Sequence, residues 1–196
     1  DTFDPRGSIK LELEQYRRDG STCWTEVIAN ILMDDGGKAV GFMGITRDIT
    51  DRKQAQESLR LSEERYRTIF ETTGNATVII REDTVISLAN SEFEKLSGYS
   101  KEDIEGKKSW RDFVVDEDRE RMTRYHHARR RDPDEAPRSY DFRLRDRRGR
   151  VRSISANATI IPGTTMSVVS LLDITERIQT EERLRTLKGG VVMVSE

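Results

Sequence analysis

The sequence predicts an α+β fold in which antiparallel strands follow one another in meanders, with helices between and after them. The first observation behind this prediction is an internal repeat. DITDRKQAQESLR, from Asp48 to Arg60, returns as DITERIQTEERLR, from Asp173 to Arg185, with eight of thirteen positions identical. The second is that each copy follows three segments in which apolar and polar residues alternate between turn residues, as in half-buried strands. A repeated supersecondary unit therefore organises the chain.

Composition limits the classes of protein to consider. The 196 residues suffice for one or two domains, and 36% of them are charged with a formal net charge of -2. Near-neutral balance argues against a chain built to bind nucleic acid or anionic lipid. We expect neither a membrane span, which needs about 18 apolar residues in a row, nor a secretory leader. The single cysteine, Cys23, fits a reducing compartment, so we expect a cytoplasmic segment, and its start at Asp1 suggests part of a longer chain.

The second copy of the meander shows the strand pattern most clearly. In RSYDFRLRD, Tyr140, Phe142 and Leu144 share one face and charged residues the other. The turn RRG leads into RVRSISANATII, where Ile154 and the alternate residues after it share a face. A Pro-Gly turn and the strand TMSVVSLL then complete three strands before DIT.

The first copy has the same order of elements. IKLELEQYRRDG, STCWTEVIANILM and AVGFMGIT are the three strands, and DDGG is a favoured hairpin turn. Gly20 lies 28 positions before Asp48, whereas Gly149 lies 24 positions before Asp173. The first copy is therefore four residues longer, a change that a hairpin tip tolerates.

The segment between the two copies adds strands and helices. NATVII and VISLA predict two short strands joined by REDT. NSEFEKLSGY predicts a short helix with Asn90 as N-cap and Gly98 as its stop, and SKEDIEG predicts another with Ser100 as cap. VDEDRERMTRYHHARRRD begins with acids and ends with arginines, an order that suits the dipole of a longer helix.

The motif N-x-x-F-x-x-L-x-G-Y, the Gly-Lys after it and the closing D-I-T together resemble the PAS family of sensor modules. The resemblance implies a five-stranded antiparallel sheet, short helices over one face and a pocket between them. It covers about residues 66–175 as a whole domain and residues 8–50 as the C-terminal half of another. The implied organisation is a partial PAS domain at 1–50, a helical linker at 51–73, a complete PAS domain at 66–175, and an exit helix and tail at 176–196.

Two departures from the family pattern concern the sheet. The turn between the first two strands usually carries Gly, and here it is REDT. The long strand of the first copy carries the family's Trp-x-Glu as Trp24 and Glu26, whereas the second copy has Ser153 and Ser155. The first copy also lacks partner strands, so residues outside this sequence or another chain would have to cover its open edge and face.

The resemblance also implies a ligand pocket in the complete domain. A filled hydrophobic core is the alternative, because a domain of this size needs large buried side chains for stability alone. Polar tips on the tryptophan and the tyrosines would need partners if buried, which leaves room for a small molecule. The expected lining residues are Ile80, Phe93, Tyr99, Trp110, Phe113, Tyr140, Phe142 and Ile154.

Each DIT lies where a strand must become a helix. We interpret the Thr hydroxyl as an acceptor for a free backbone N–H at the helix start, and each Asp as a partner of the Arg four positions along or of neighbouring backbone. A plain helix cap is the simpler reading. The resemblance implies a further role, because this motif joins PAS sensors to their effectors. The candidate relay residues are Asp48, Thr50, Arg52, Asp173, Thr175 and Arg177.

The helix after the first DIT carries a stripe of small and apolar residues at heptad spacing. This spacing predicts either a parallel homodimer through a short coiled coil or a helix packed on its own domain. We call this stripe the seam; it consists of Ala55, Leu59, Ser62, Tyr66, Ile69 and Thr73.

Cofactor and catalytic signatures are weak. His126 and His127 are adjacent and point in different directions on a helix, so they do not form a metal site, and they come late in the helix for a haem ligand. Cys23 lies on a strand, outside the short helical motif that flavin photosensing by this family requires. The arginines of 119–131 are diluted by acids, which favours a solvated helix over a nucleic-acid surface. No phosphate loop, phosphoacceptor His motif or nucleophile elbow is present, so we expect no catalysis by this segment.

The sequence therefore predicts a sensory module of a prokaryotic signalling protein, with a histidine kinase as the expected parent. A small ligand or a contact would change the sheet, and the second DIT would pass the change to the exit helix and an effector domain in the same chain. One alternative is a ligand-free module for dimerisation or protein contacts. Another is a redox or gas sensor carrying haem or flavin.

Overall fold

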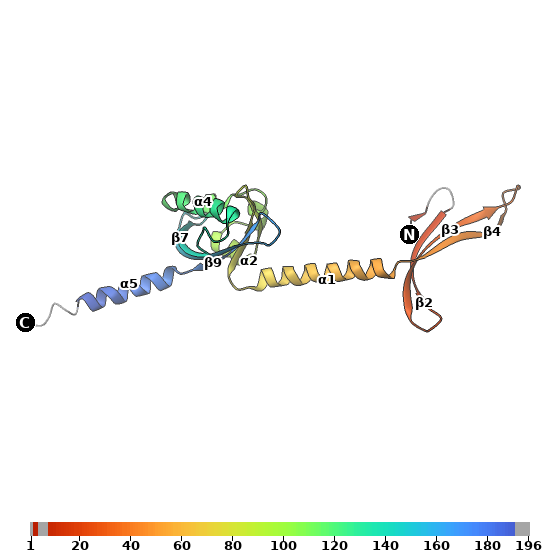
Figure 1. Ribbon diagram of the computed structural model, residues 1–196, viewed down its shortest axis with the longest axis horizontal. Coiled ribbons are helices and arrows are strands. Elements are labelled where there is room, and N and C mark those ends of the chain that lie inside the picture. Colours follow the sequence, from red (N-terminus) through yellow and green to blue (C-terminus); the bar gives the residue numbers. More distant parts are fainter. Residues whose placement is uncertain (1, 4–7, 191–196) are drawn as a thin grey trace, which may run out of the picture. The chain divides into compact units, whose positions relative to one another are not determined.

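The computed structural model describes residues 2–3 and 8–190. The chain divides into two compact units, Asp1–Arg67 and Thr68–Glu196. Helix α1 (Thr50–Thr72) begins in the first unit and ends in the second (Figure 1). Each unit contains one antiparallel sheet.

The sheet of the first unit has four strands in the order β1-β2-β3-β4. The three longer strands are those that the sequence predicts. The two-residue strand that pairs with β2 was not predicted. The β3–β4 hairpin turns at Gly37, whose φ of +78° is easy for glycine alone. The bounds are β1 (Thr2–Phe3), β2 (Ser8–Tyr16), β3 (Thr22–Met33) and β4 (Ala39–Asp48).

The first unit buries few side chains. Among its residues of described burial, only Thr25, Glu26 and Ile49 are buried. On the sheet face that contains Thr25, Leu13 is 41% exposed and Phe42 is 76% exposed. This apolar face is therefore uncovered by the described residues, and β4 lies at the edge of its sheet.

The second unit has the five-stranded antiparallel sheet implied by the resemblance, in the order β6-β5-β9-β8-β7. The central position of β9 results from its pairing with both β5 and β8. The bounds are β5 (Ala76–Ile80), β6 (Ile86–Ala89), β7 (Ser139–Arg145), β8 (Val151–Ile160) and β9 (Ser167–Asp173).

The helices of the second unit begin and end at the residues that local chemistry favours. Asn90 caps α2 by accepting from the Phe93 amide, and Gly98 ends it with a φ of +76°. Ser100 caps α3 by accepting from the Asp103 amide, as predicted. The helices are α2 (Ser91–Ser97), α3 (Lys101–Ile104), the 3-10 helix η1 (Trp110–Phe113), α4 (Asp116–Arg131) and α5 (Thr175–Gly190).

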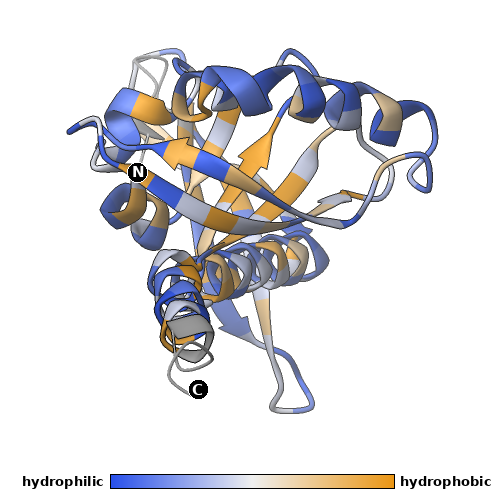
Figure 2. Cartoon of the chain, turned by 90° about the vertical axis from the view of Figure 1, so that its left-hand side faces the viewer, coloured by the Kyte–Doolittle hydropathy of each residue, from blue (hydrophilic) through white to orange (hydrophobic). Residues whose placement is uncertain are grey.

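The hydrophobic core of the second unit lies between one face of the sheet and the covering helices. Ile86, Ile104 and Ile154 are completely buried in it. Figure 2 shows hydrophobic strand segments beneath α4, whose outer side is largely hydrophilic. This matches a helix whose buried residues are Met122, His126 and Arg129.

The two sheets share one register. Asp48 at the end of β4 pairs with Thr25, and Asp173 at the end of β9 pairs with Ile154. In the neighbouring strand, Leu13 lies opposite Thr25 as Phe142 lies opposite Ile154. The exposed apolar face of the first unit therefore corresponds to the core face of the second.

The turn between β5 and β6 departs from the family pattern, and the structure shows how. Thr84 has a φ of +75°, in the left-handed region that a β-branched residue rarely adopts. Its hydroxyl shares a hydrogen bond of 2.8 Å with the Ser109 hydroxyl, and its carbonyl accepts from the Trp110 amide at 3.1 Å. These bonds tie the turn to η1 and help to hold an unfavourable backbone conformation.

The seam of α1 is open to solvent. Leu59 is 61%, Tyr66 70% and Ile69 55% exposed, and α1 has no buried residue. Packing of this stripe on the described parts of the chain is therefore not observed. Within 2–3 and 8–190, none of the helices combines the length and the hydrophobicity that crossing a bilayer requires.

Candidate functional site

The interior cavity of the second unit is very small. Its volume is about 30 Å³, room for about one water molecule. Of the residues that were expected to line a pocket, five line this cavity: Phe93, Trp110, Phe113, Tyr140 and Phe142. The other three, Ile80, Tyr99 and Ile154, belong to the same hydrophobic core but do not line the cavity.

Two aromatic side chains place polar groups next to this core. The Trp110 indole Nε1 is buried and has no hydrogen-bond partner among the described residues, an unusual state for such a group. Burial raises the pKa of the Tyr140 hydroxyl, opposed by the nearby Arg129 guanidinium, which lies 5.7 Å from the ring centre. Both residues line the cavity, and the indole of Trp110 keeps one buried donor without a partner among the described residues.

The first joint connects β4 to α1 through Asp48, Ile49 and Thr50. The Thr50 amide donates to Asp48 Oδ1 at 2.9 Å, and the Thr50 hydroxyl accepts from the Trp24 amide at 3.0 Å. The Ile49 amide donates to the Trp24 carbonyl at 2.8 Å. Hydrogen bonds from Thr50, and then the charge of Arg17 at 2.5 Å, lower the pKa of the Asp48 carboxyl.

The second joint connects β9 to α5 with the same bonds. The Thr175 amide donates to Asp173 Oδ1 at 3.0 Å, and its hydroxyl accepts from the Ser153 amide at 2.9 Å. The Ile174 amide donates to the Ser153 carbonyl at 2.9 Å. Burial opposes ionisation of Asp173, but bonds from Thr175 and from Arg152, at 2.7 Å, outweigh it and lower its pKa.

Two details of the sequence interpretation were wrong. The Thr hydroxyls accept from an amide of the neighbouring strand, because the chain turns at Asp and brings Thr back against that strand. The carboxylates pair with Arg17 and Arg152. They do not pair with the arginines four positions along, because the helix begins at Thr and its first turn points those side chains elsewhere. The other expectation, that each Asp bonds to neighbouring backbone, is confirmed.

The first joint is surrounded by ion pairs that attach the first turn of α1 to β2 and β3. Arg52 bonds to Glu12 at 2.6 Å and lies 3.6 Å from Glu26. Lys53 bonds to Glu12 at 2.5 Å, and Lys10 bonds to Glu26 at 2.8 Å. We call this set the ionic clamp; it consists of Lys10, Glu12, Glu26, Arg52 and Lys53.

The second joint lacks this clamp. By register, Asp141 and Ser155 stand where the first unit has Glu12 and Glu26. Arg177, which corresponds to Arg52, instead donates to Glu181 within α5 at 2.9 Å. The helix start of α5 is therefore held by the Asp–Thr bonds with less support from the sheet surface.

Sequence reasoning missed one cluster, at the entrance to the second unit. Glu71 in the last turn of α1 bonds to Ser91 and Lys101, which begin α2 and α3. The cap residue Asn90 was predicted, but not its bond to the Phe70 carbonyl at 3.1 Å. The run of Asn-Ser just before an apolar helix signals a cap, but nothing local signals its partners on another helix.

The two adjacent histidines on α4 have different surroundings. His126 is 5% exposed and its Nε2 lies 3.0 Å from the Glu82 carbonyl, so Nε2 carries the hydrogen. Burial, reinforced by the charges of Arg130 and Arg111, lowers the pKa of His126 to about 4. His127 is exposed. Within the described residues, no cluster of three side chains suited to hold a metal ion occurs.

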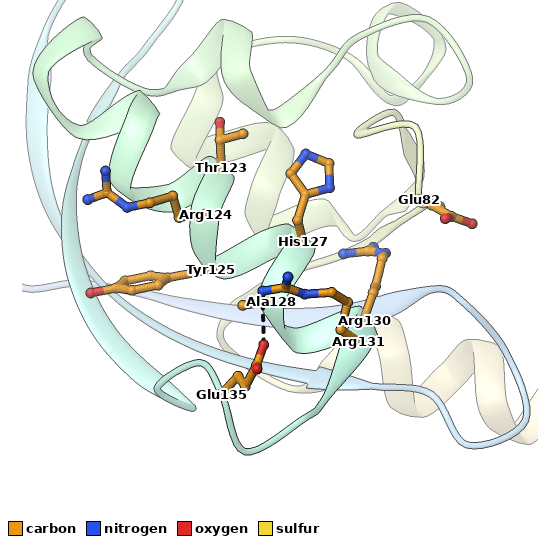
Figure 3. A pocket seen from close by; sticks show the side chains of 9 residues that line it. All are labelled: Glu82, Thr123, Arg124, Tyr125, His127, Ala128, Arg130, Arg131 and Glu135. Atoms are coloured by element: carbon orange, nitrogen blue, oxygen red, sulfur yellow. Dashed lines mark hydrogen bonds and ion pairs between the residues drawn. The ribbon is translucent and has the colours of Figure 1, made fainter.

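A shallow hollow of about 800 Å³ lies on the outer side of α4 (Figure 3). Its rim mixes charges: Arg131 pairs with Glu135 at 3.0 Å, and Glu82 faces the same hollow. Arg130 is bonded to the Thr165 and His126 carbonyls at 2.9 and 2.8 Å. These contacts make the arginines part of the unit's own structure.

Comparison with known proteins finds family matches in both units of the chain. The family described as PAS fold matches residues 86–175, and the family described as PAS domain matches residues 2–51. The chain belongs to the PAS domain family. It is a PAS sensory region, in agreement with the resemblance carried by its motifs.

Relatives and a solved structure of this family resemble the chain over different shares. "Probable diguanylate cyclase DgcE" of Escherichia coli is 30% identical over 54% of this chain and 10% of its own length. "Sensor protein FixL" of Bradyrhizobium diazoefficiens is 27% identical over 88% of this chain and 35% of its own. The chain thus spans about a tenth to a third of these relatives. The PAS domain of a Colwellia psychrerythraea protein has a TM-score of 0.51 and 21% identity, covering 58% of this chain and 97% of that one.

Proposed function

We propose that this chain is part of the input region of a two-component histidine kinase and that the Asp173–Thr175 joint passes a change in the second sheet to α5. The single observation that carries the proposal is the repetition of one set of bonds at both joints. At each joint, the hydroxyl of the Thr accepts a hydrogen bond from a backbone amide of the neighbouring strand. The similarity to a sensor protein over 88% of the chain supports the input role.

The chemistry of the joint suits a relay. β9 is central in the sheet, so a shift in the sheet moves Asp173. The Thr175 amide and hydroxyl bond to the Asp173 carboxylate, and the hydroxyl also meets the Ser153 amide of β8. The start of α5 therefore follows two strands at once. We place the effector domain after α5 in the same chain and the whole assembly in the cytoplasm.

The proposal is tested in the complete signalling protein by signal-dependent autophosphorylation. We expect Asp173→Ala and Thr175→Val to reduce the response by about fivefold or more, the range of a modest coupling free energy. Thr180→Val is the matched control, because its hydroxyl bonds only within α5. Undiminished regulation in a folded Thr175→Val protein would contradict the proposal.

A second candidate function follows from the cavity volume. A space of about 30 Å³ admits about one water, so the second unit in this conformation is a filled core. In this alternative the module responds to protein contacts and binds no small molecule. Native mass spectrometry of freshly purified protein distinguishes a module that senses a small ligand from this contact module. Added small-molecule mass supports ligand sensing, and the mass of the polypeptide alone supports the contact module.

We also propose that the chain forms a parallel homodimer through the seam of α1. The exposure of Leu59, Tyr66 and Ile69 at heptad spacing supports this. Light scattering should give twice the chain mass for the natural sequence and one chain mass for Leu59→Asp. Leu61→Asp, at an exposed position outside the seam, should remain dimeric. A monomeric natural sequence at high concentration would contradict the dimer.

A further inference from the structure

The second unit has an entrance as well as an exit, at the last turn of α1. Asn90 is fully buried there, and its side-chain amide has five hydrogen-bond partners, one of which is the Thr73 hydroxyl at 3.4 Å. Its Oδ1 accepts from the Thr77 and Phe93 amides at 2.8 and 3.0 Å. Its Nδ2 donates to the Phe70 and Asn75 carbonyls at 3.1 and 2.8 Å. One side chain thus joins the end of α1, strand β5 and the first turn of α2.

A charged group next to Asn90 extends this junction to a third helix. Glu71 Oε2 accepts from the Ser91 amide at 3.0 Å and the Ser91 hydroxyl at 2.7 Å. Its Oε1 accepts from Lys101 Nζ at 2.5 Å. Both charged side chains are less than a third exposed, at 30% and 27%. Bonds from Lys101 and then Ser91 lower the pKa of Glu71 to about 2, so the carboxylate is ionised at neutral pH. We call Glu71, Ser91 and Lys101 the entrance clamp.

The two helices that the entrance clamp holds form part of the wall of the core. Phe93 of α2 lines the cavity, and its ring packs against Phe113 at 5.3 Å between ring centres. Ile104 of α3 is completely buried. A movement of the last turn of α1 therefore reaches the cavity wall through Glu71, α2 and α3, in parallel with the link from α1 to the sheet through Asn90.

We propose that Glu71 is a positioning residue that couples α1 to α2 and α3, so that the second unit receives changes from the preceding helix as well as from its own core. This inference rests on the proposed function, in which the unit relays structural change. It assigns to the second unit an input of protein origin. Nothing in it requires a bound ligand.

The coupling is measured by hydrogen exchange on the 196-residue chain. Arg65→Gly loosens α1 upstream of the entrance clamp, since glycine is unfavourable inside a helix. We follow the amides of Gly98 and Glu105, which bond to the Glu94 and Lys101 carbonyls at 2.8 Å and report on α2 and α3. We expect Arg65→Gly to speed their exchange about fivefold in the natural background. In a Glu71→Ala background it should speed them less than about twofold.

The control is Glu63→Ala, an exposed glutamate on the same helix, which should keep the fivefold response. Protection in β8 and β9 checks that each variant folds, and Lys101→Gln replaces Glu71→Ala if that variant does not. An equal response with and without Glu71, or no response in the natural background, would overturn the inference. This experiment reads entry into the unit and needs no effector. Its failure is therefore distinct from a failure of the autophosphorylation test at Thr175.

Discussion

The two units share a register and a joint but differ on both faces of the sheet. On the core face, Phe142 is 6% exposed where Leu13, at the corresponding position, is 41% exposed. On the opposite face, the ionic clamp supports the start of α1, whereas Arg177 turns to its own helix. The same joint bonds therefore occur at the start of α1, which ion pairs attach to the sheet, and at the start of α5, where Arg177 bonds within its own helix. We infer that the second is the one that moves.

The largest expected effect contrasts the two core faces. Phe142→Ala should destabilise the second unit by about 3–5 kcal/mol, because it opens a cavity in a packed core. Leu13→Ala should cost the first unit less than about 1 kcal/mol, because that side chain is already partly in water. Each unit contains one of the two tryptophans, Trp24 and Trp110, so urea unfolding followed in single-tryptophan variants reads each unit separately. Equal losses in the two units would contradict the assignment of the faces.

The free energy of unfolding of the second unit should depend on pH through His126, which belongs to that unit. The pKa of His126 is about 4 in the folded second unit and 6.5 ordinarily, so the unfolded state binds more protons between these values. Stability is therefore full above the ordinary pKa and is lost as pH falls toward the folded one, by about 2 kcal/mol between about pH 7 and about pH 5.

The groups that face His126 are Arg130, His127 and Arg111, and they add to the effect of burial. The measurement is urea unfolding of the second unit across this range, reported by the Trp110 fluorescence. His126→Gln should flatten the pH dependence. A variant that keeps the full slope would show that another group titrates.

The next effect tests the joints directly. Thr175→Val leaves the Ser153 amide without its acceptor, which should weaken the start of α5 by about 1 kcal/mol. Thr50→Val removes the same bond to Trp24, but the ionic clamp remains, so α1 should respond less. The measurement is hydrogen exchange of the Ile178 and Lys53 amides, each of which bonds to the isoleucine carbonyl of its joint at 3.0 Å. For each amide we take the ratio of the exchange rate in the variant to the rate in the natural sequence. A larger ratio at Lys53 would reverse the comparison.

The smallest effect concerns the ionic clamp itself. Glu26→Gln should speed exchange of the Lys53 amide about threefold at low salt and little at high salt, because the cations that pair with Glu26, Lys10 and Arg52, are 52% and 48% exposed and are screened by salt. Glu14→Gln, an exposed glutamate on the neighbouring strand, is the matched control. An effect that persists in high salt would indicate packing in place of charge.

The parts of the fold that depend on local chemistry could be predicted from the sequence. Alternation in RSYDFRLRD gave β7 because strand side chains alternate between faces. Asn90 and Ser100 were identified as caps because their side chains satisfy amides within three residues. The five-stranded sheet followed from the family motifs, which single strands alone would not have ordered.

The parts that depend on distant partners could not be predicted. Arg17, just after β2, and Arg152, on β8, reach the joint aspartates from other parts of the chain, and no sequence spacing marks that encounter. Glu71 meets Lys101 30 positions away for the same reason. The cavity volume depends on how aromatic rings such as Phe93 and Phe113 interlock, which composition does not specify. Thr84 shows that a tertiary contact can hold a conformation that local preference opposes.

The most direct test of the account transfers the support of the first joint to the second. Asp141→Glu lengthens a carboxylate whose charge already acts on Arg177, and Ser155→Glu adds a second one, at the positions where the first unit has Glu12 and Glu26. Asp141→Gln with Ser155→Gln is the control of equal size without the charges. The account predicts slower exchange of the Ile178 amide and a weaker signal response of the complete protein in the glutamate variant alone. A glutamate variant in which the Ile178 amide exchanges more slowly but the signal response is unchanged would contradict the claim that movement at this joint carries the signal.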